Sequence, residues 1–291
     1  MNFDYLTKIK NTVNLSTKKK TSHLLEGNFK SIQRGRSMEF SDLKEYDFGD
    51  NVNDIDWKSS SRTDNILVRR YMAEKKHNVL LVGDNGVKML GDSLSLEPKQ
   101  ELALMTFGTL AYLSDLKGAD FSLSVARRDT FNVNMFRSGT DHLERQLYEY
   151  KKYMAEPSRL SIGEVLDATI KMIPKRMIVF VITDLAGLST INEAIVRRVT
   201  TNNDLLVVNI DDASMFTPGA FNLHTQKYVL PFFSRFSDLK EEETKERTRI
   251  MDETKALFRK YRVSMVTVSK EEEIIDKVIE LLEKNNYGIL S

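Results

Sequence analysis

Two short apolar runs dominate the hydrophobic pattern of this sequence. Residues 77–84 read HNVLLVGD and residues 176–184 read RMIVFVITD, so each run is almost unbroken and ends in an aspartate. Runs of this length that are rich in β-branched residues are typical of strands buried on both faces, as in the interior of a parallel sheet. Ligands of such sheets bind at the carboxyl ends of the strands, where the strand order reverses. Asp84 and Asp184 are therefore the first candidate site residues.

Helical and strand-like patterns alternate along the rest of the chain. The pattern predicts strands at 121–127, 130–137, 204–210 and 263–268, and helices at about 97–115, 140–155, 161–173, 190–202, 238–261 and 270–285. The segment 211–233 is predicted to form a small hairpin. This order predicts a Rossmann-like α/β fold: a mostly parallel sheet with one antiparallel edge strand and helices on both faces. In that sheet the 77–83 and 177–183 strands lie side by side, which brings their terminal aspartates to one edge.

The sequence predicts three parts. Residues 1–38 are a basic segment, partly helical or flexible; residues 4–15 have the spacing of an amphipathic helix, but a solvated, mobile end is the simpler interpretation. Residues 39–75 combine turn signals with an alternating run at 66–72, which predicts a small β-rich appendage. Residues 76–291 form the α/β domain.

Composition narrows the class of protein. The 43 basic residues nearly cancel the 42 acidic ones, so no overall field favours nucleic acid, and nucleic-acid binding is not expected. The absence of cysteine excludes disulfides, thiolate nucleophiles and iron–sulfur clusters, and is typical of a reducing compartment. No apolar run approaches the roughly 20 residues of a membrane helix. We therefore expect a cytoplasmic protein without a membrane span.

The edge that holds the two aspartates has oxygen ligands of the kind that Mg²⁺ prefers. Thr183 adds a hydroxyl, and Ser158 or Ser161 would supply another. The alternative is that each aspartate only caps the turn or helix that follows its strand.

The block at 39–74 resembles the signature of a bacterial family, domain of unknown function family 58. The matching residues are Glu39, Phe40, Leu43, Tyr46, Gly49, Asp50, Ile55, Asp56, Trp57, Arg62 and Glu74, with a late proline–glycine element at Thr217-Pro218-Gly219. The order of elements after residue 76, with aspartates at the ends of two strands, resembles a von Willebrand factor A-like domain. Together the resemblances cover about residues 25–285.

The resemblance implies a metal site of the form Asp-x-Ser-x-Ser, from which this chain departs. Its residues are Asp84-Asn85-Gly86-Val87-Lys88, so both serines are missing and Lys88 stands in place of the second. An ammonium beside Asp84 would neutralise that carboxylate and compete with a cation for it. We therefore expect a degenerate site, formed by Asp84 and Asp184, that binds Mg²⁺ weakly or not at all and presents an Asp84–Lys88 pair for docking.

The resemblance also implies a partner. Proteins of this family are typically encoded beside MoxR-type AAA+ ATPases and are thought to act as adaptors in chaperone-like assembly. The expectation is a non-enzymatic protein-interaction platform. Its candidate partner-binding or signature residues are Gly49, Asp50, Asp56, Trp57, Arg62, Gly86, Lys88 and Thr183.

Two alternatives stay open. Asp56-Trp57-Lys58 has the acid-x-lysine spacing of many metal-dependent nucleases, in which carboxylates hold Mg²⁺ while the lysine activates water. The lysine run at 18–20 would suit a phosphate- or nucleic-acid-binding surface whose affinity falls steeply with salt. A structural interpretation competes with the nuclease. In it Trp57 fills a seam against the main domain, and three aspartates cap turns and pair with nearby arginines. The aspartates are Asp50, Asp54 and Asp56, and the arginines are Arg62, Arg69 or Arg70.

Overall fold

The computed structural model describes residues 5–19, 40–48, 50, 52, 55–63, 65–71, 78–214, 221–222, 227–228 and 237–290. The chain divides into two compact units, which we describe separately: a large unit of Met1–Phe29 with His77–Ser291, and a small unit of Lys30–Lys76. Several residues singled out above lie outside the described residues, namely Lys20, Glu39, Gly49, Asp54, Glu74 and the element at 217–219.

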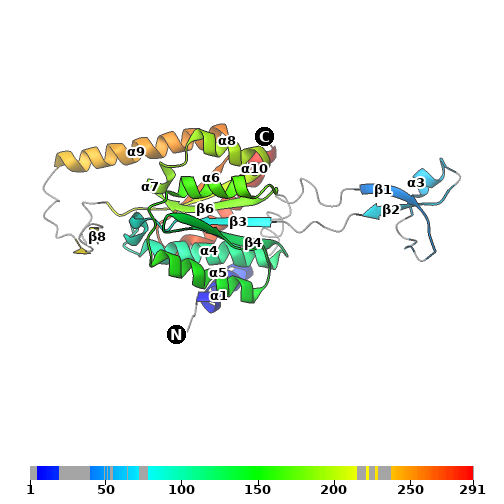
Figure 1. Cartoon of the computed structure of the whole chain (residues 1–291), viewed down its shortest axis with the longest axis horizontal. Coiled ribbons are helices and arrows are strands. Elements are labelled where there is room, and N and C mark those ends of the chain that lie inside the picture. Colours follow the sequence, from blue (N-terminus) through cyan, green and yellow to red (C-terminus); the bar gives the residue numbers. More distant parts are fainter. Residues whose placement is uncertain are drawn as a thin grey trace. The chain divides into compact units, whose positions relative to one another are not determined.

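A six-stranded sheet forms the centre of the large unit, in the order β10-β7-β6-β3-β4-β5 (Figure 1). All neighbouring strands are parallel except β4 and β5, which form the predicted antiparallel edge. The predicted Rossmann-like, von Willebrand factor A-type fold is therefore confirmed. The strands are β3 (Asn78–Gly83), β4 (Asp120–Arg127), β5 (Thr130–Val133), β6 (Ile178–Asp184), β7 (Asp204–Ile210) and β10 (Ser264–Val268).

Helices cover both faces of this sheet, which explains why its central strands are apolar on both sides. In Figure 1, α6 (Ile162–Met172), α8 (Glu193–Asn202) and α9 (Ser237–Lys260) lie above the sheet, and α4 (Lys99–Leu116) and α5 (Thr140–Met154) lie below it. Shorter elements are η2 (Val87–Leu90), α7 (Leu185–Leu188) and η4 (Glu271–Glu273), and the C-terminal helix α10 (Ile274–Leu290) packs against α4. No described helix has the length and apolarity needed to cross a membrane.

The N-terminal helix α1 (Tyr5–Lys19) packs against α4. Ile9 and Val13 are buried, and the Tyr5 hydroxyl donates a hydrogen bond of 2.6 Å to Glu101. The close approach requires Gly108 of α4, because a Cβ there would overlap the Ile9 side chain. The predicted amphipathic helix is therefore present, and the interpretation of this end as solvated and mobile is wrong for its apolar stripe, because Ile9 and Val13 are buried.

The small unit contains the predicted β appendage. Strands β1 (Phe40–Glu45) and β2 (Leu67–Tyr71) pair antiparallel, and the short helix α3 (Trp57–Ser60) lies between them in the chain. Ile55 bridges to Val68 of β2, and both side chains are buried. A second small hairpin, β8 (Phe221–Asn222) with β9 (Lys227–Tyr228), occurs within the segment where one was predicted.

Candidate functional site

Asp84 and Asp184 lie on the same edge of the central sheet. Strands β3 and β6 are parallel neighbours, with Gly83 opposite Ile182, so both chains reach this edge at their carboxyl ends. The strand order reverses here, because β3 lies between β6, which leads to β7 and β10, and β4, which leads to β5. Both aspartates are buried, 7% and 1% exposed. Two acidic side chains thus meet at the switch point of the fold, where ligands of open α/β sheets bind.

Asp84 is held by hydrogen bonds on both carboxylate oxygens. Oδ2 accepts from the Thr183 hydroxyl at 2.5 Å, and Oδ1 accepts from the Gly86 backbone N–H at 2.8 Å. Burial raises the pKa of Asp84 to about 6, and the charge of Asp184 adds to the shift, although the two hydrogen bonds and Lys99 oppose it. Groups with such shifted pKa values gather at functional sites, because folding alone gains nothing from a buried charge.

Asp84 is expected to make the protein less stable as the pH rises. Its pKa is about 6 in the folded state against an ordinary value of 3.8 for an aspartate, so the folded state binds the extra proton between these two pH values. The stability that the protein gains from keeping Asp84 protonated is fully present below pH 3.8 and is lost as the pH rises through about 6. Between pH 5 and pH 7.5 the free energy of unfolding should therefore fall by about 1–2 kcal/mol through this group.

Asp84→Asn isolates this contribution from other titrating groups. The fall in unfolding free energy between the two pH values, measured by urea titration, should be smaller in the variant by that same amount. Equal falls in the two proteins, or a larger fall in the variant, would contradict the assignment.

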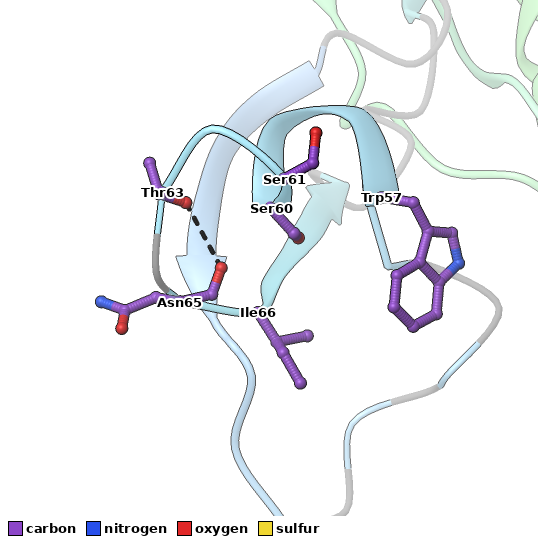
Figure 2. Close-up of a pocket in the computed structure, with 6 residues that line it drawn as sticks. All are labelled: Trp57, Ser60, Ser61, Thr63, Asn65 and Ile66. Atoms are coloured by element: carbon purple, nitrogen blue, oxygen red, sulfur yellow. Dashed lines mark hydrogen bonds between the residues drawn. The ribbon is translucent and has the colours of Figure 1, made fainter.

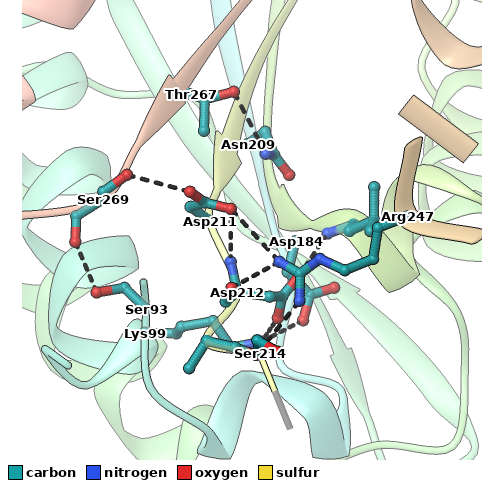
Figure 3. Close-up of polar contacts among 12 residues, drawn as sticks. Ser93, Lys99, Asp184, Asn209, Asp211, Asp212, Ser214, Arg247, Thr267 and Ser269 are labelled. Atoms are coloured by element: carbon teal, nitrogen blue, oxygen red, sulfur yellow. Dashed lines mark hydrogen bonds and ion pairs between the residues drawn. The ribbon is translucent and has the colours of Figure 1, made fainter. Parts of the chain in front are cut away.

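Asp184 caps α7 and binds a buried lysine. Its Oδ1 accepts from the Gly187 N–H at 3.0 Å, and its Oδ2 lies 2.6 Å from Lys99 Nζ (Figure 3). Lys99 is the first residue of α4 and only 2% exposed, and its ammonium also bonds to the Asp212 carboxylate. Burial by itself would lower the pKa of Lys99, but the carboxylates of Asp184 and Asp212 outweigh it and raise that pKa. Lys99 is therefore a charged group enclosed by two carboxylates.

Asp212 extends the network to the loop after β7. Its Oδ2 accepts from the Leu185 N–H at 3.2 Å, which ties this loop to the start of α7. Arg247 of α9 donates to the Asp212 carbonyl oxygen at 2.6 Å and lies 3.7 Å from the Asp211 carboxylate (Figure 3). The loops that follow β6 and β7 are thus fastened to each other and to helices on both faces of the sheet.

The lysine at this edge is not the one predicted from the sequence. Lys88 lies in η2 and is exposed, and among the described residues it is not a partner of Asp84. The expected Asp84–Lys88 pair is therefore wrong, and the buried ammonium comes from Lys99. Asp212 was missed as well, although it follows an apolar strand as the other two aspartates do. Lys99 could have been singled out from the sequence because it is a lysine in the first turn of a predicted helix, a position where acidic residues are preferred.

The serines proposed as further ligands are engaged elsewhere. The Ser158 hydroxyl donates to the Arg128 carbonyl oxygen at 2.6 Å, and Ser161 caps α6 by accepting from the Glu164 N–H. All four carboxylate oxygens of Asp84 and Asp184 already accept a bond from the chain. In the described part of the chain, no group of three acidic or histidine side chains is placed to hold a metal. The donor set at this edge does not fit a divalent cation.

The acidic residues of the signature block have local structural partners. Asp56 is the N-cap of α3 and accepts from the Ser59 N–H at 3.1 Å, while Asp50 lies 2.6 Å from Lys44 Nζ. The triplet Asp56-Trp57-Lys58 therefore opens a short helix and does not lie on a strand. The predicted capping by Asp56 is confirmed. Within the small unit the indole of Trp57 is 66% exposed, and the seam against the main domain stays a prediction.

The side chain of Trp57 lines a pocket of about 280 Å³ on the small unit (Figure 2). Ile66 lies at the same pocket and is 48% exposed, and Arg62 is exposed on the turn that follows α3. The remaining lining residues are Ser60, Ser61, Thr63 and Asn65. We call the exposed side chains of Trp57, Lys58, Arg62 and Ile66 the Trp57 face.

Comparison with known families resolves the membership of the chain. Residues 42–226 match the family described as "Protein of unknown function DUF58". The chain belongs to the DUF58 family. The match includes most of the signature block of the small unit and the central strands of the large one, so the resemblance drawn from the sequence is confirmed. No curated protein matches the sequence.

Several solved structures resemble this DUF58 protein. One is the conserved hypothetical protein BatB from Bacteroides thetaiotaomicron, at 14% identity and a TM-score of 0.42, covering 72% of this chain and 99% of that one. Another is a von Willebrand factor type A protein from Catenulispora acidiphila, at 10% identity and a TM-score of 0.37, covering 74% of this chain and 43% of that one. A third is the SpRpn10 VWA domain, at 11% identity and a TM-score of 0.34, covering 70% and 94%.

Proposed function

We propose that this protein is a non-enzymatic protein-interaction platform and that the Trp57 face binds its partner. The observation that carries this proposal is the exposure of Trp57 at a pocket inside the family signature block. Exposed tryptophan and arginine are the side chains that contribute most to protein–protein affinity. A large aromatic side chain that is mostly exposed gains most from a partner that covers it.

The switch point of the sheet supports the same proposal. Its carboxylates are buried and bonded to Thr183, Gly86, Gly187 and Lys99, so they offer no open position to a substrate. A nucleophile or general base needs an accessible atom within hydrogen-bonding reach of the reacting group. A fixed, closed edge suits a rigid scaffold for docking better than it suits a reaction centre.

The partner we propose is an AAA+ ATPase of the MoxR type. Membership of the DUF58 family supports this choice, because such proteins are typically encoded beside ATPases of that type. In this proposal the protein acts as an adaptor in chaperone-like assembly of other proteins. Lys58 and Arg62 are exposed and lie close to Trp57 in the sequence, and their positive charges favour an acidic rim on the partner's docking site.

Affinity purification from the native host tests the platform and its surface together. An AAA+ ATPase should co-elute with the wild-type chain, and Trp57→Ala should reduce its recovery by about tenfold or more. Tyr148→Ala is the matched control, because Tyr148 is an aromatic side chain on α5 that is 61% exposed. Recovery that is equal in all three proteins, or lost in the control, would overturn the assignment of the surface.

Incubation with plasmid DNA and Mn²⁺ addresses the nuclease alternative. The proposal predicts no cleavage above that of a Lys58→Ala preparation. Cleavage that disappears in Lys58→Ala would replace the platform by an enzyme that uses Asp56 and Lys58.

A further inference from the structure

The ammonium of Lys99 lies where two loops converge at the carboxyl edge of the sheet. One carboxylate comes from the end of β6 (Asp184) and the other from the loop after β7 (Asp212). The distance from Nζ to Asp184 Oδ2 is 2.6 Å, at the upper end of the 2.3–2.6 Å range in which Ca²⁺ binds oxygen. The ammonium therefore lies between two carboxylates, one at the end of β6 and one in the loop after β7.

The electrostatics of the edge require a cation at this point. Asp84, Asp184 and Asp212 lie close enough for the charge of Asp184 to raise the pKa of both other carboxyls. Asp184 is 1% exposed, so water screens its charge very little. Without a positive charge between them, Asp184 and Asp212 would repel each other in a medium of low dielectric constant.

The chain holds Lys99 in place at some cost to helix α4. A lysine in the first turn of a helix faces the positive end of the helix dipole, which is unfavourable. The backbone N–H of Lys99 donates to the Gly91 carbonyl oxygen at 3.0 Å, and a Cβ on Gly91 would lie 3.7 Å from Lys99 Cε. The loop that leads into α4 therefore holds Lys99 through its backbone.

We propose that the Lys99 ammonium is a resident cation that takes the place of a divalent metal ion at this edge of the fold. It binds the loops after β6 and β7 together through Asp184 and Asp212, so the edge keeps its shape without metal. The inference concerns the large unit alone and does not depend on the partner proposed above.

Thermal unfolding of the full chain in EDTA, and in about 10 mM Mg²⁺ or Ca²⁺, tests whether the Lys99 ammonium takes the place of a divalent ion. The wild-type melting temperature should be the same in all three solutions. Lys99→Ala removes the ammonium and leaves room for a hydrated ion between the carboxylates. Its melting temperature should be well below that of the wild type in EDTA and should rise by about 5 °C or more with one of the divalent ions.

Lys171→Ala is the matched control, because Lys171 also lies 2.6 Å from an aspartate, Asp167, but on the surface. It should show no rise with either ion. Three results would overturn the proposal. The first is a wild-type protein that Mg²⁺ or Ca²⁺ stabilises in a manner that Asp184→Asn abolishes. The others are a folded Lys99→Ala variant that responds to neither ion, and a Lys99→Ala variant that stays unfolded in both.

Discussion

Lys99→Met is expected to lower the free energy of unfolding by about 3–5 kcal/mol, the usual result of removing one partner from a buried ion pair. Methionine fills the space of the lysine stem but leaves Asp184 and Asp212 without their shared cation. Because methionine fills this space and Asp184 is almost fully buried, neither water nor a counterion replaces the lost charge. Urea titration at pH 7.5, with the slope checked for two-state behaviour, measures the loss.

Two further variants separate charge from packing. Lys171→Met breaks a surface pair with Asp167 and should cost no more than about 1 kcal/mol. The triple variant Lys99→Met/Asp184→Asn/Asp212→Asn removes the stranded charges and should regain most of the loss, because neutral amides still accept the hydrogen bonds of α7. A loss in Lys99→Met no larger than in Lys171→Met would show that the buried pair does not stabilise the edge.

Gly187→Ala is expected to lower the free energy of unfolding by about 3–5 kcal/mol, since it combines overpacking with loss of a buried hydrogen bond to a carboxylate. A Cβ on Gly187 would overlap the Thr183 hydroxyl oxygen, and it would lie 2.5 Å from Asp84 Oδ2 and 2.9 Å from Ile162 Cγ2. Thr183 is fully buried on β6 and has no space into which to turn. The bond between Thr183 and Asp84 therefore breaks, or α7 moves away from the sheet.

Gly91→Ala is the control for this substitution on the same edge. Its Cβ would meet the Lys88 carbonyl oxygen at 3.5 Å and Lys99 Cε at 3.7 Å, which are ordinary contacts, and its φ of −78° suits any residue. It should change the unfolding free energy by less than about 1 kcal/mol. Similar losses in the two alanine variants would show that the predicted crowding around Gly187 is absent.

The strands that form the centre of the sheet are readable from local pattern. The apolar runs at 77–84 and 176–184 have no helical period, and residues 79–84 and 177–184 are buried between the helices on the two faces. Their parallel pairing followed from the alternation of strands with helices, and it brought Asp84 and Asp184 to one edge as predicted. The same alternation predicted the antiparallel edge strand, because a two-residue link permits only a hairpin.

Contacts between distant segments were not readable in this way. The apolar stripe of α1 has the same spacing whether it faces water or packs on α4. The folded structure shows that it is buried against α4, where Gly108 leaves room for Ile9. Likewise, a lysine near Asp84 in the chain was an obvious candidate partner, whereas Lys99 is separated from Asp184 by 85 positions. Closeness in the sequence favoured Lys88. Which lysine reaches the edge depends instead on how the folded backbone places it.

Hydrophobic periodicity and the residues that end each strand were enough to predict the α/β fold and the edge on which acidic side chains gather, and the resemblance of the 39–74 block indicated the family. These features depend on a few neighbouring residues, and the chain repeats them from element to element. The cation that neutralises this edge depends on burial and charge summed over segments far apart in the chain. Such sums exist only once the sheet has brought β3, β6 and β7 together, so they appear in the folded protein and not in the pattern along the sequence.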